Sequence, residues 1–274
     1  MVQDLSNFMS EVWTKKFMTP LKKNTVMKAL VNTDYEGEAK ENKTVQIRVF
    51  PSTIPTNAYT DTCVYSELQS VLVPLLLDQK VQFGFMVDDV SEAQSNLNII
   101  EGHLTAGRNS TEIAVDTALL ALNVDVDAGN VIATSKITKN TVYADLVAVS
   151  VVLKNNYVTA AQKPYCVIPT AVEALLIQAP EFIQANTLGA NTLTEGSIGK
   201  VAGMDIFVST NMTDIGGTYR IFASHKGAVT IAGSLSKIEQ LRDKGSFGTF
   251  VRGLYVFGAL LAKPLEAAVK VCTV

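Results

Sequence analysis

The chain has 274 residues, which is enough for one large domain or two small ones with a buried core. Hydrophobic residues make up 47% and charged residues 18%, which excludes a disordered chain, and the formal net charge of −3 excludes a surface that is basic throughout. The mean hydropathy of +0.21 is high, yet apolar runs such as 71–77 are too short to span a bilayer. We therefore expect the apolar surplus to serve a core and subunit contacts, with no membrane partner.

The N-terminal region has two short amphipathic stretches, over residues 7–19 and 21–32. They predict an arm with an apolar face or an ordinary surface helix, and periodicity alone leaves both open. The region lacks the continuous apolar run of a signal peptide. Its lysines form a mild cluster that is more typical of a solvated helix face than of a contact with nucleic acid or an acidic partner: Lys15, Lys16, Lys22, Lys23 and Lys28.

An extended hairpin is predicted next. Val45, Ile47 and Val49 alternate with polar residues, as in a strand with one buried face. Residues 51–67 are polar and rich in turn formers, and a second extended run covers 68–87. Such a polar tip has too little apolar content to hold itself on a core, so it is either free or lies on a neighbour.

Helical periodicity returns over 91–123, with Ser91 as a plausible cap, and again over 141–156. Gly102 and Gly107 each destabilise a helix interior by about 1 kcal/mol relative to Ala. Their presence indicates a bend or a close approach of another element to the backbone.

Residues 164–169 are expected to form a buried strand, followed by a helix that opens with a capping box of Thr170 and Glu173 and ends at Pro180. Residues 184–199 are predicted to form a loop, and residues 201–210 a strand. A strand pair is predicted over 219–232, and strands broken near Pro264 over 250–274. Helices and strands mix without regular alternation, so the predicted fold class is α+β.

The glycine-rich residues 196–212 raise the possibility of a phosphate-binding loop. A dinucleotide fingerprint needs G-x-G-x-x-G between a strand and a helix, whereas here the glycines are Gly196, Gly199 and Gly203. Residues 204–209 alternate as a strand, and no G-K-[ST] opens a helix. A nucleotide-binding enzyme is therefore disfavoured, and we expect Gly203 to supply a turn conformation.

Acidic residues form no convincing site. Asp88 and Asp89 are adjacent and point apart on an extended chain, so helix capping suits them better than a carboxylate pair. Asp125, Asp127 and Asn130 faintly resemble a calcium loop, but the glycine and the glutamate of an EF-hand are missing.

Histidine and cysteine offer little material for catalysis. His103 falls within a predicted helix, and in Ser224–His225–Lys226 successive side chains alternate along a strand, which does not build a triad. The three cysteines are Cys63, Cys166 and Cys272, which are distant, odd in number and fit a reducing compartment better than a disulfide framework. We predict that the chain is not an enzyme and has no catalytic, cofactor-binding or metal-binding residue.

The order of several segments carries a family resemblance: WTKK, VDDVSEAQSN, CVIPTAVEALL, GKVAGMDIFVSTN, FASHKGAVTIA and VRGLYVFGALLAKPLEAAV. Together they resemble the major capsid proteins of tailed bacteriophages, which have the Hong Kong 97 phage fold, over residues 11–271. The resemblance implies an N-terminal arm (1–40), an extended loop (41–87), a peripheral domain with a long spine helix (88–129 and 221–274) and an axial domain (130–220).

The resemblance also implies a function. Copies would assemble into hexamers and pentamers of an icosahedral or prolate head that encloses double-stranded DNA without sequence-specific binding. The partners would be further copies, a separate scaffolding protein, a portal and decoration proteins, with assembly in the bacterial host cytoplasm. Some members crosslink a lysine of the extended loop to a neighbour, but residues 51–66 contain no lysine, so no such mesh is expected. An encapsulin-type compartment shell, which holds a cargo enzyme, is the alternative.

Overall fold

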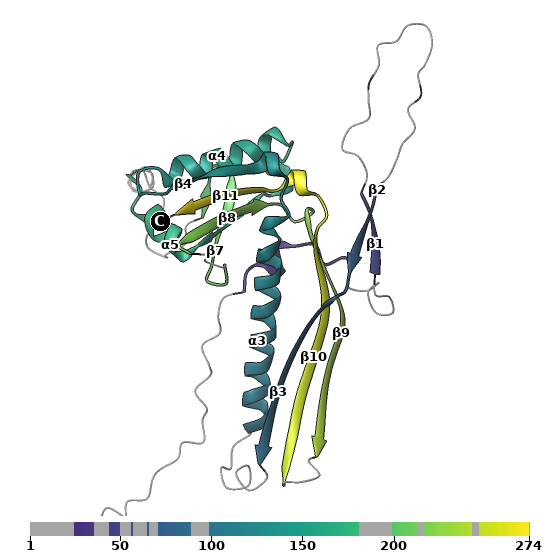
Figure 1. Ribbon diagram of the computed structural model, residues 1–274. Coiled ribbons are helices and arrows are strands. Elements are labelled where there is room, and N and C mark those ends of the chain that lie inside the picture. Colours follow the sequence, from purple (N-terminus) through teal and green to yellow (C-terminus); the bar gives the residue numbers. More distant parts are fainter. Residues whose placement is uncertain are drawn as a thin grey trace, which may run out of the picture.

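The computed structural model describes residues 25–35, 44–49, 56, 65, 71–88, 99–180, 199–212, 216–242 and 247–273. It contains two modules and a hairpin (Figure 1). The compact module is a six-stranded sheet with its helices. The elongated module is a long helix that runs beside a three-stranded sheet, and the hairpin projects from the other side of that sheet.

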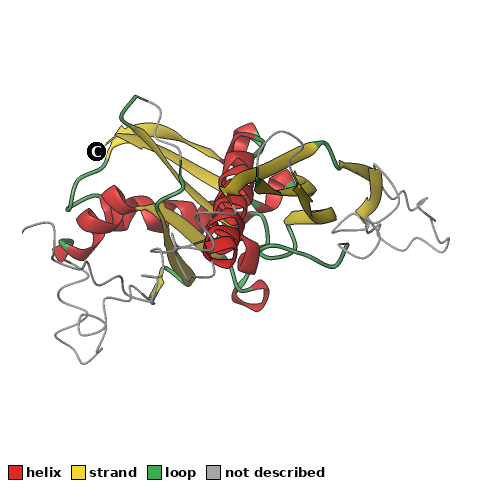
Figure 2. Cartoon of the chain, turned by 90° about the horizontal axis from the view of Figure 1, so that it is seen from below, coloured by secondary structure: helices red, strands yellow, loops and turns green. Residues whose placement is uncertain are grey.

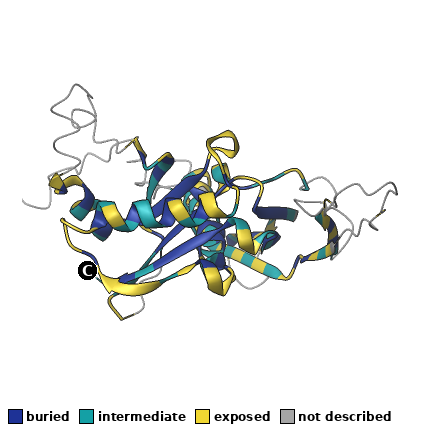
Figure 3. Cartoon of the chain, turned by 90° about the horizontal axis from the view of Figure 1, so that it is seen from above, coloured by how far each residue is buried: buried dark blue, intermediate teal, exposed yellow. Residues whose placement is uncertain are grey.

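The six-stranded sheet of the compact module has the order β4-β11-β8-β5-β7-β6. Its strands are β4 (Val131–Lys136), β5 (Tyr165–Pro169), β6 (Lys200–Val201), β7 (Met204–Ser209), β8 (Thr218–Ser224) and β11 (Ala268–Thr273). Two helices, α4 (Val142–Asn155) and α5 (Thr170–Ile177), pack on one face through the same apolar cluster. From above, the central strands of the sheet are largely buried, the edge strand β4 is largely exposed, and α4 alternates buried and exposed positions (Figure 3).

Side chains of the central strand β5 alternate between the two faces of the sheet, as a strand requires. Cys166 and Ile168 belong to the core with α4 and α5, whereas Tyr165 and Val167 belong to a second core below. A buried ion pair adds to the first face, because Lys270 on β11 lies 3.3 Å from Asp145 on α4. All five residues of β5 are buried, which confirms the strand predicted there.

The elongated module consists of α3 (Ile99–Ala121) and the sheet β3-β10-β9, with β3 (Gln79–Asp88), β9 (Val229–Arg242) and β10 (Gly248–Leu261) all antiparallel. From below, α3 is seen nearly end-on among the strands (Figure 2). The close approach expected at Gly107 is confirmed, because a Cβ there would lie 2.5 Å from the ring of Phe83 on β3. At Gly102 no close approach is seen, because a Cβ there would meet no atom of the described residues within 4 Å.

The second core joins the two modules. The end of α3 contributes Val115, Leu119 and Leu120, which pack with Val167 and Phe222 of the six-stranded sheet. Residues of β9, β10 and the short helix α1 (Met27–Leu30) complete the same cluster. The chain crosses between the modules through 122–130, 225–228 and 262–267, where the short helices η3 (Leu122–Val124), η4 (Ala128–Asn130) and η7 (Pro264–Glu266) lie. A further short helix, η5 (Ala160–Gln162), precedes β5.

The hairpin consists of β1 (Thr44–Val49) and β2 (Val71–Leu76), which pair antiparallel. Val45, Ile47, Leu75 and Leu77 are buried with Ala232 of β9, which fixes the base of the hairpin on the elongated module. The alternation predicted for the first strand is confirmed at Val45 and Ile47.

Three predictions about strands and caps are wrong. The extended run over 68–87 contains two strands in different sheets, because β2 pairs with β1 while β3 pairs with β10. The strand pair over 219–232 is likewise divided between β8 and β9. The capping box is absent, since the helix begins at Thr170 after Pro169 and no side chain caps it.

The structure confirms the helix predicted over 141–156. It also confirms the helix predicted over 91–123 in its described part, 99–121. The break predicted near Pro264 is confirmed as well. The predicted domain boundaries at 87/88 and 220/221 fall inside β3 and β8. The predictions for Ser91, Asp89 and residues 7–19 lie outside the described residues. So do most of the residues predicted as the hairpin tip (51–67) and as a loop (184–199). Among the described helices, none combines the length and apolar character that a membrane span requires.

Candidate assembly surface

An exposed apolar surface lies at the far end of the elongated module. On the face of the sheet opposite α3, Met86, Phe250 and Leu241 occupy one cross-strand row of β3, β10 and β9. Their exposed fractions are 50%, 38% and 44%, and Phe247, the residue just before β10, is 81% exposed. We call these four residues the apolar tip. Adjacent apolar side chains at cross-strand positions form a continuous patch, which marks a contact site on a soluble protein.

A charged row bounds the apolar tip on the same face. Arg252 is paired with Glu239 across β10 and β9, and Lys237 lies against the same carboxylate. The hydrogen bonds and charges of Lys237 and Arg252 hold the pKa of Glu239 below its ordinary value. An apolar centre with a charged rim is the usual layout of a protein–protein contact.

The hairpin carries a second exposed apolar face. Leu72, Pro74 and Leu76 alternate along β2 with the buried Leu75, and the two leucines are 55% and 54% exposed. In a single chain this face of β2 meets solvent, although its opposite face is docked on the elongated module. It therefore offers a surface to another molecule.

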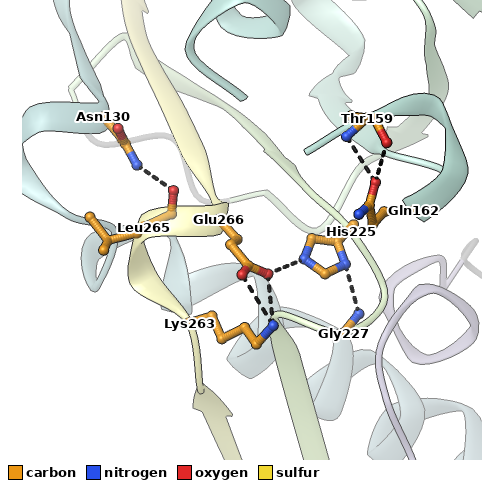
Figure 4. Close-up of polar contacts among 8 residues, drawn as sticks. All are labelled: Asn130, Thr159, Gln162, His225, Gly227, Lys263, Leu265 and Glu266. Carbon is orange, nitrogen blue, oxygen red and sulfur yellow. Dashed lines mark hydrogen bonds and ion pairs between the residues drawn. The ribbon is translucent and has the colours of Figure 1, made fainter. Parts of the chain in front are cut away.

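The crossings between the modules are tied together by a polar cluster, which we call the joint (Figure 4). His225 Nε2 lies 2.6 Å from a carboxylate oxygen of Glu266, and Lys263 Nζ lies 3.1 Å from the same oxygen. The backbone N–H of Gly227 donates to His225 Nδ1 at 3.1 Å. That nitrogen therefore keeps its lone pair, and Nε2 carries the proton that points at Glu266.

Asn130 extends the joint to the third crossing. Its side-chain amide donates to the carbonyls of Leu265 and Ala267, and Asn156 at the end of α4 donates to its Oδ1 at 2.8 Å. The neighbouring Asp127 accepts from the N–H of Gly129 and caps η4. These contacts give Asp127 and Asn130 structural roles in place of the calcium loop that they faintly resemble.

A buried carboxylate anchors the first described residues. Asp116 on α3 is 1% exposed, and its Oδ1 accepts from the backbone N–H groups of Val26 and Met27 at 3.0 and 2.8 Å. Its Oδ2 accepts from the side chain of Asn211, which follows β7. One carboxylate thus joins three segments that are far apart in the sequence.

Gly199 and Gly203 behave as turn formers. Ala202 and Gly203 connect β6 to β7 with φ of 52° and 87°, and Gly199 before them has φ of 67°. Two successive positive φ values are typical of a tight two-residue hairpin turn. The predicted turn role of Gly203 and the strand after it are confirmed.

The remaining candidate residues are dispersed. His103 is exposed on α3, with its ring 5.4 Å from that of Phe85. No hydrogen bond joins Ser224 to His225 in the part of the chain that the structure describes. Burial raises the pKa of the Cys166 thiol to about 12, and burial with Asp145 nearby raises that of Cys272 to about 11. Among the described residues, no group of His, Cys, Asp and Glu could hold a metal ion.

Sequence reasoning missed the joint and the Asp116 anchor. His225 and Glu266 are separated by 41 residues, and Asp116 and Val26 by 90. No local spacing relates such pairs, although an aspartate on the apolar side of a long helix is a signal of a buried polar contact.

Comparison with known proteins explains the arrangement. The family model of the phage capsid proteins matches residues 80–270, well over half of the chain. The chain belongs to the phage capsid protein family. Copies of such a protein form the shell of the virion head.

Solved structures agree with the family of this phage capsid protein. A structure of Mycobacterium phage Che8 is 25% identical, covers 97% of both chains and superposes with a TM-score of 0.82. The capsid of Cyanophage P-SCSP1u is 16% identical over 100% of this chain and 95% of its own, with a TM-score of 0.77. These similarities confirm the expected Hong Kong 97-type fold.

The SrpI encapsulin of Synechococcus elongatus is 9% identical over 98% of this chain and 95% of its own, with a TM-score of 0.66, and it shares the fold alone. The phage capsid family therefore fits this chain better than the encapsulin alternative. No curated protein sequence matches the chain.

Proposed function

We propose that this capsid protein is the major building block of a tailed-phage head, in which hexamers and pentamers enclose double-stranded DNA. The observation that carries the proposal is the pair of exposed apolar faces, at the apolar tip and on β2, in a chain whose family forms shells. The apolar tip lies at the far end of the elongated module, and β2 lies on the hairpin that projects from this module, so each face can reach a different neighbour (Figure 1). Burying them on assembly removes apolar area from water, which stabilises the contact.

The proposed division of the chain follows the sheets. Residues 44–76 with the hairpin act as the extended loop, and α3 with β3, β9 and β10 acts as the peripheral domain. The six-stranded sheet with α4 and α5 acts as the axial domain, which therefore includes β8 and β11. The residues before 41 act as the arm.

The role is structural, and we propose that the chain has no catalytic activity and binds no cofactor. The proposed partners are further copies, a separate scaffolding protein, a portal and decoration proteins, with assembly in the host cytoplasm. The enclosed DNA is bound without sequence specificity, which agrees with a net charge of −3.

Negative-stain electron microscopy of the expressed full chain tests the proposal. We expect closed shells, and, for particles from infected cells, nuclease-protected double-stranded DNA. Shells that hold a protein cargo and no DNA would favour the encapsulin alternative. A protein that stays monomeric under assembly conditions and turns over a small ligand contradicts the proposal.

Variants test the two apolar faces directly. Phe250→Asp with Leu241→Asp places charges in the apolar tip, and Leu72→Asp with Leu76→Asp does the same on β2. Each pair should abolish shells while the far-UV circular dichroism of the unassembled protein stays unchanged. The matched controls Phe250→Leu with Leu241→Met, and Leu72→Met with Leu76→Met, keep the faces apolar and should assemble. Normal shells from both charged pairs would show that neither face is an assembly contact.

A further inference from the structure

A polar pocket with a volume of about 240 Å³ lies where four segments of the chain meet. The segments are residues 32–35 after α1, strand β1 of the hairpin, the start of β9, and the crossing at 262–263. Each of them brings at least one side chain that can donate a hydrogen bond. These polar lining residues are Asn32, Tyr35, Arg48, Thr230 and Lys263.

The lining of this pocket is cationic. Arg48 and Lys263 carry the charges, and none of the described residues that line the pocket is acidic. Arg48 is exposed and has no ion pair or side-chain hydrogen bond to another described residue. Lys263 lies 3.1 Å from both carboxylate oxygens of Glu266, but its ammonium group has three N–H donors. A whole guanidinium and one ammonium donor are therefore left to bind an anion.

The hydroxyl of Thr230 gives an independent indication of a ligand. Thr230 is 1% exposed, and its Oγ1 has no hydrogen-bond partner among the described residues. The backbone on either side of it is already paired with Asn32, which donates to Val229 and accepts from Ile231. Buried polar side chains are nearly always hydrogen-bonded. Because Thr230 lines the pocket, a molecule bound there can supply the missing partner.

Asn32 and Tyr35 complete the set of donors. The Oδ1 atom of Asn32 accepts from the N–H of Asp34 at 2.9 Å, which leaves its NH₂ group as the available part of the amide. The Tyr35 hydroxyl has no partner among the described residues. Phosphate has acceptor oxygens on every side, whereas a carboxylate accepts only along one edge. Donors from four segments around one pocket therefore favour a phosphate group.

We propose that this pocket binds a phosphate group, with Arg48, Lys263 and Thr230 as its main partners. The group belongs either to free inorganic phosphate or to the backbone of a nucleic acid, since both present the same acceptor oxygens. Bound there, it links β1 to β9 and to the crossing, and so holds the base of the hairpin against the joint. The pocket is lined entirely by one copy of the chain, so the inference does not depend on the proposed shell.

Isothermal titration calorimetry of the unassembled full-length protein with sodium phosphate, at constant ionic strength, tests the binding. Arg48→Gln removes the charge and should raise the dissociation constant of phosphate about tenfold, as the loss of one charge-assisted hydrogen bond predicts. Thr230→Val keeps the shape of the side chain without its hydroxyl and should raise the constant about fivefold. The matched control Lys136→Gln removes an exposed cation of β4 and should leave the constant unchanged.

A short oligonucleotide without terminal phosphates distinguishes the two sources of the group. Oligonucleotide binding that displaces phosphate and is weakened by Arg48→Gln assigns the pocket to a nucleic-acid backbone. Phosphate binding that the oligonucleotide does not disturb assigns it to the free ion. Either result supports the phosphate site.

Hydrogen–deuterium exchange locates the bound group. Phosphate should slow exchange over residues 44–49 and leave exchange over 142–155 unchanged. Arg48 is exposed, so its substitution tests the site even where Thr230→Val lowers stability. The proposal is overturned if neither probe binds, if Arg48→Gln leaves binding unchanged, or if the protected amides lie elsewhere. An unchanged constant in a folded Thr230→Val protein would remove the role assigned to that hydroxyl.

Discussion

The ring of Phe83 on β3 lies directly against the backbone of Gly107 in the middle of α3, and a Cβ at that position would be 2.5 Å from the ring. The contact lets the helix lie close on the sheet over the length of the elongated module. Only glycine fits there without displacing the two elements, because a side chain would force them apart.

Replacing Gly107 by alanine should therefore lower the free energy of unfolding by about 1–3 kcal/mol, because overpacking outweighs the gain in helix propensity. The matched control is Gly102→Ala on the same helix, where a Cβ meets no atom of the described residues within 4 Å. It should raise the free energy of unfolding by about 0.5–1 kcal/mol. Denaturant unfolding of the unassembled protein measures both, and equal effects of the two changes would contradict the role of the Phe83 contact.

Asp116→Ala should destabilise the protein by about 3 kcal/mol, because it leaves the buried N–H groups of Val26 and Met27 without an acceptor. Limited proteolysis should then cleave within residues 25–31 faster than in the unmodified protein. Asp116→Asn keeps one acceptor oxygen and should have a smaller effect. The exposed Asp125→Ala serves as control and should leave both readouts unchanged.

Removal of the carboxylate charge in the joint, by Glu266→Gln, should lower the free energy of unfolding by about 1–3 kcal/mol. The change removes the ion pair with Lys263 and weakens the bond from His225, whose side chain is nearly buried. Glu239→Gln removes a carboxylate that binds two cations, Lys237 and Arg252, whose side chains are 62% and 63% exposed. Solvent screens that site, so its substitution should change stability much less. An equal loss in both variants would argue that the joint is no better protected from water than the surface.

The buried thiols make stability depend on alkaline pH. Folding raises the pKa of Cys166 from 9.0 to about 12 and that of Cys272 from 9.0 to about 11. The unfolded chain therefore releases these protons first as pH rises. The stabilisation is complete below pH 9 and is lost between about pH 9 and pH 12.

Thiol labelling checks this prediction in a Cys63→Ser background, which removes the third cysteine. At pH 8 the two thiols should react only at the rate of unfolding, since the reactive species is the thiolate. Adding Cys272→Ser should flatten part of the pH dependence of the free energy of unfolding. Fast labelling of the folded protein at pH 8 would show that the thiols are not shielded.

The elements with strong local signals were predictable from the sequence. The helix at 142–155 and the strand at 165–169 follow from apolar periodicity and from a short apolar run, which tertiary contacts reinforce. The capping box failed because Pro169 precedes the helix in an extended conformation and Thr170 already lies within it. Thr170 and Glu173 have the residue types of the motif, but the helix already begins at Thr170, so the N-cap position belongs to Pro169.

Sheet membership and the polar contacts were not predictable in the same way. Residues 68–87 are extended throughout, and only pairing with β10, more than 160 residues later, separates β3 from β2. The joint and the Asp116 anchor likewise depend on partners that no local spacing connects. The order of segments along the chain predicted the capsid family without any of these contacts, because it reflects the whole fold.

Because β9 and β10 are long, a small rotation at the joint would move their far ends by a large distance. β9 and β10 each have 14 residues, which is roughly 46 Å at about 3.3 Å per residue. If the two modules tilt by about 5° about the crossings, the far ends of these strands move by about 4 Å. In the proposed shell, a tilt of this size would decide whether the apolar tip meets its neighbour.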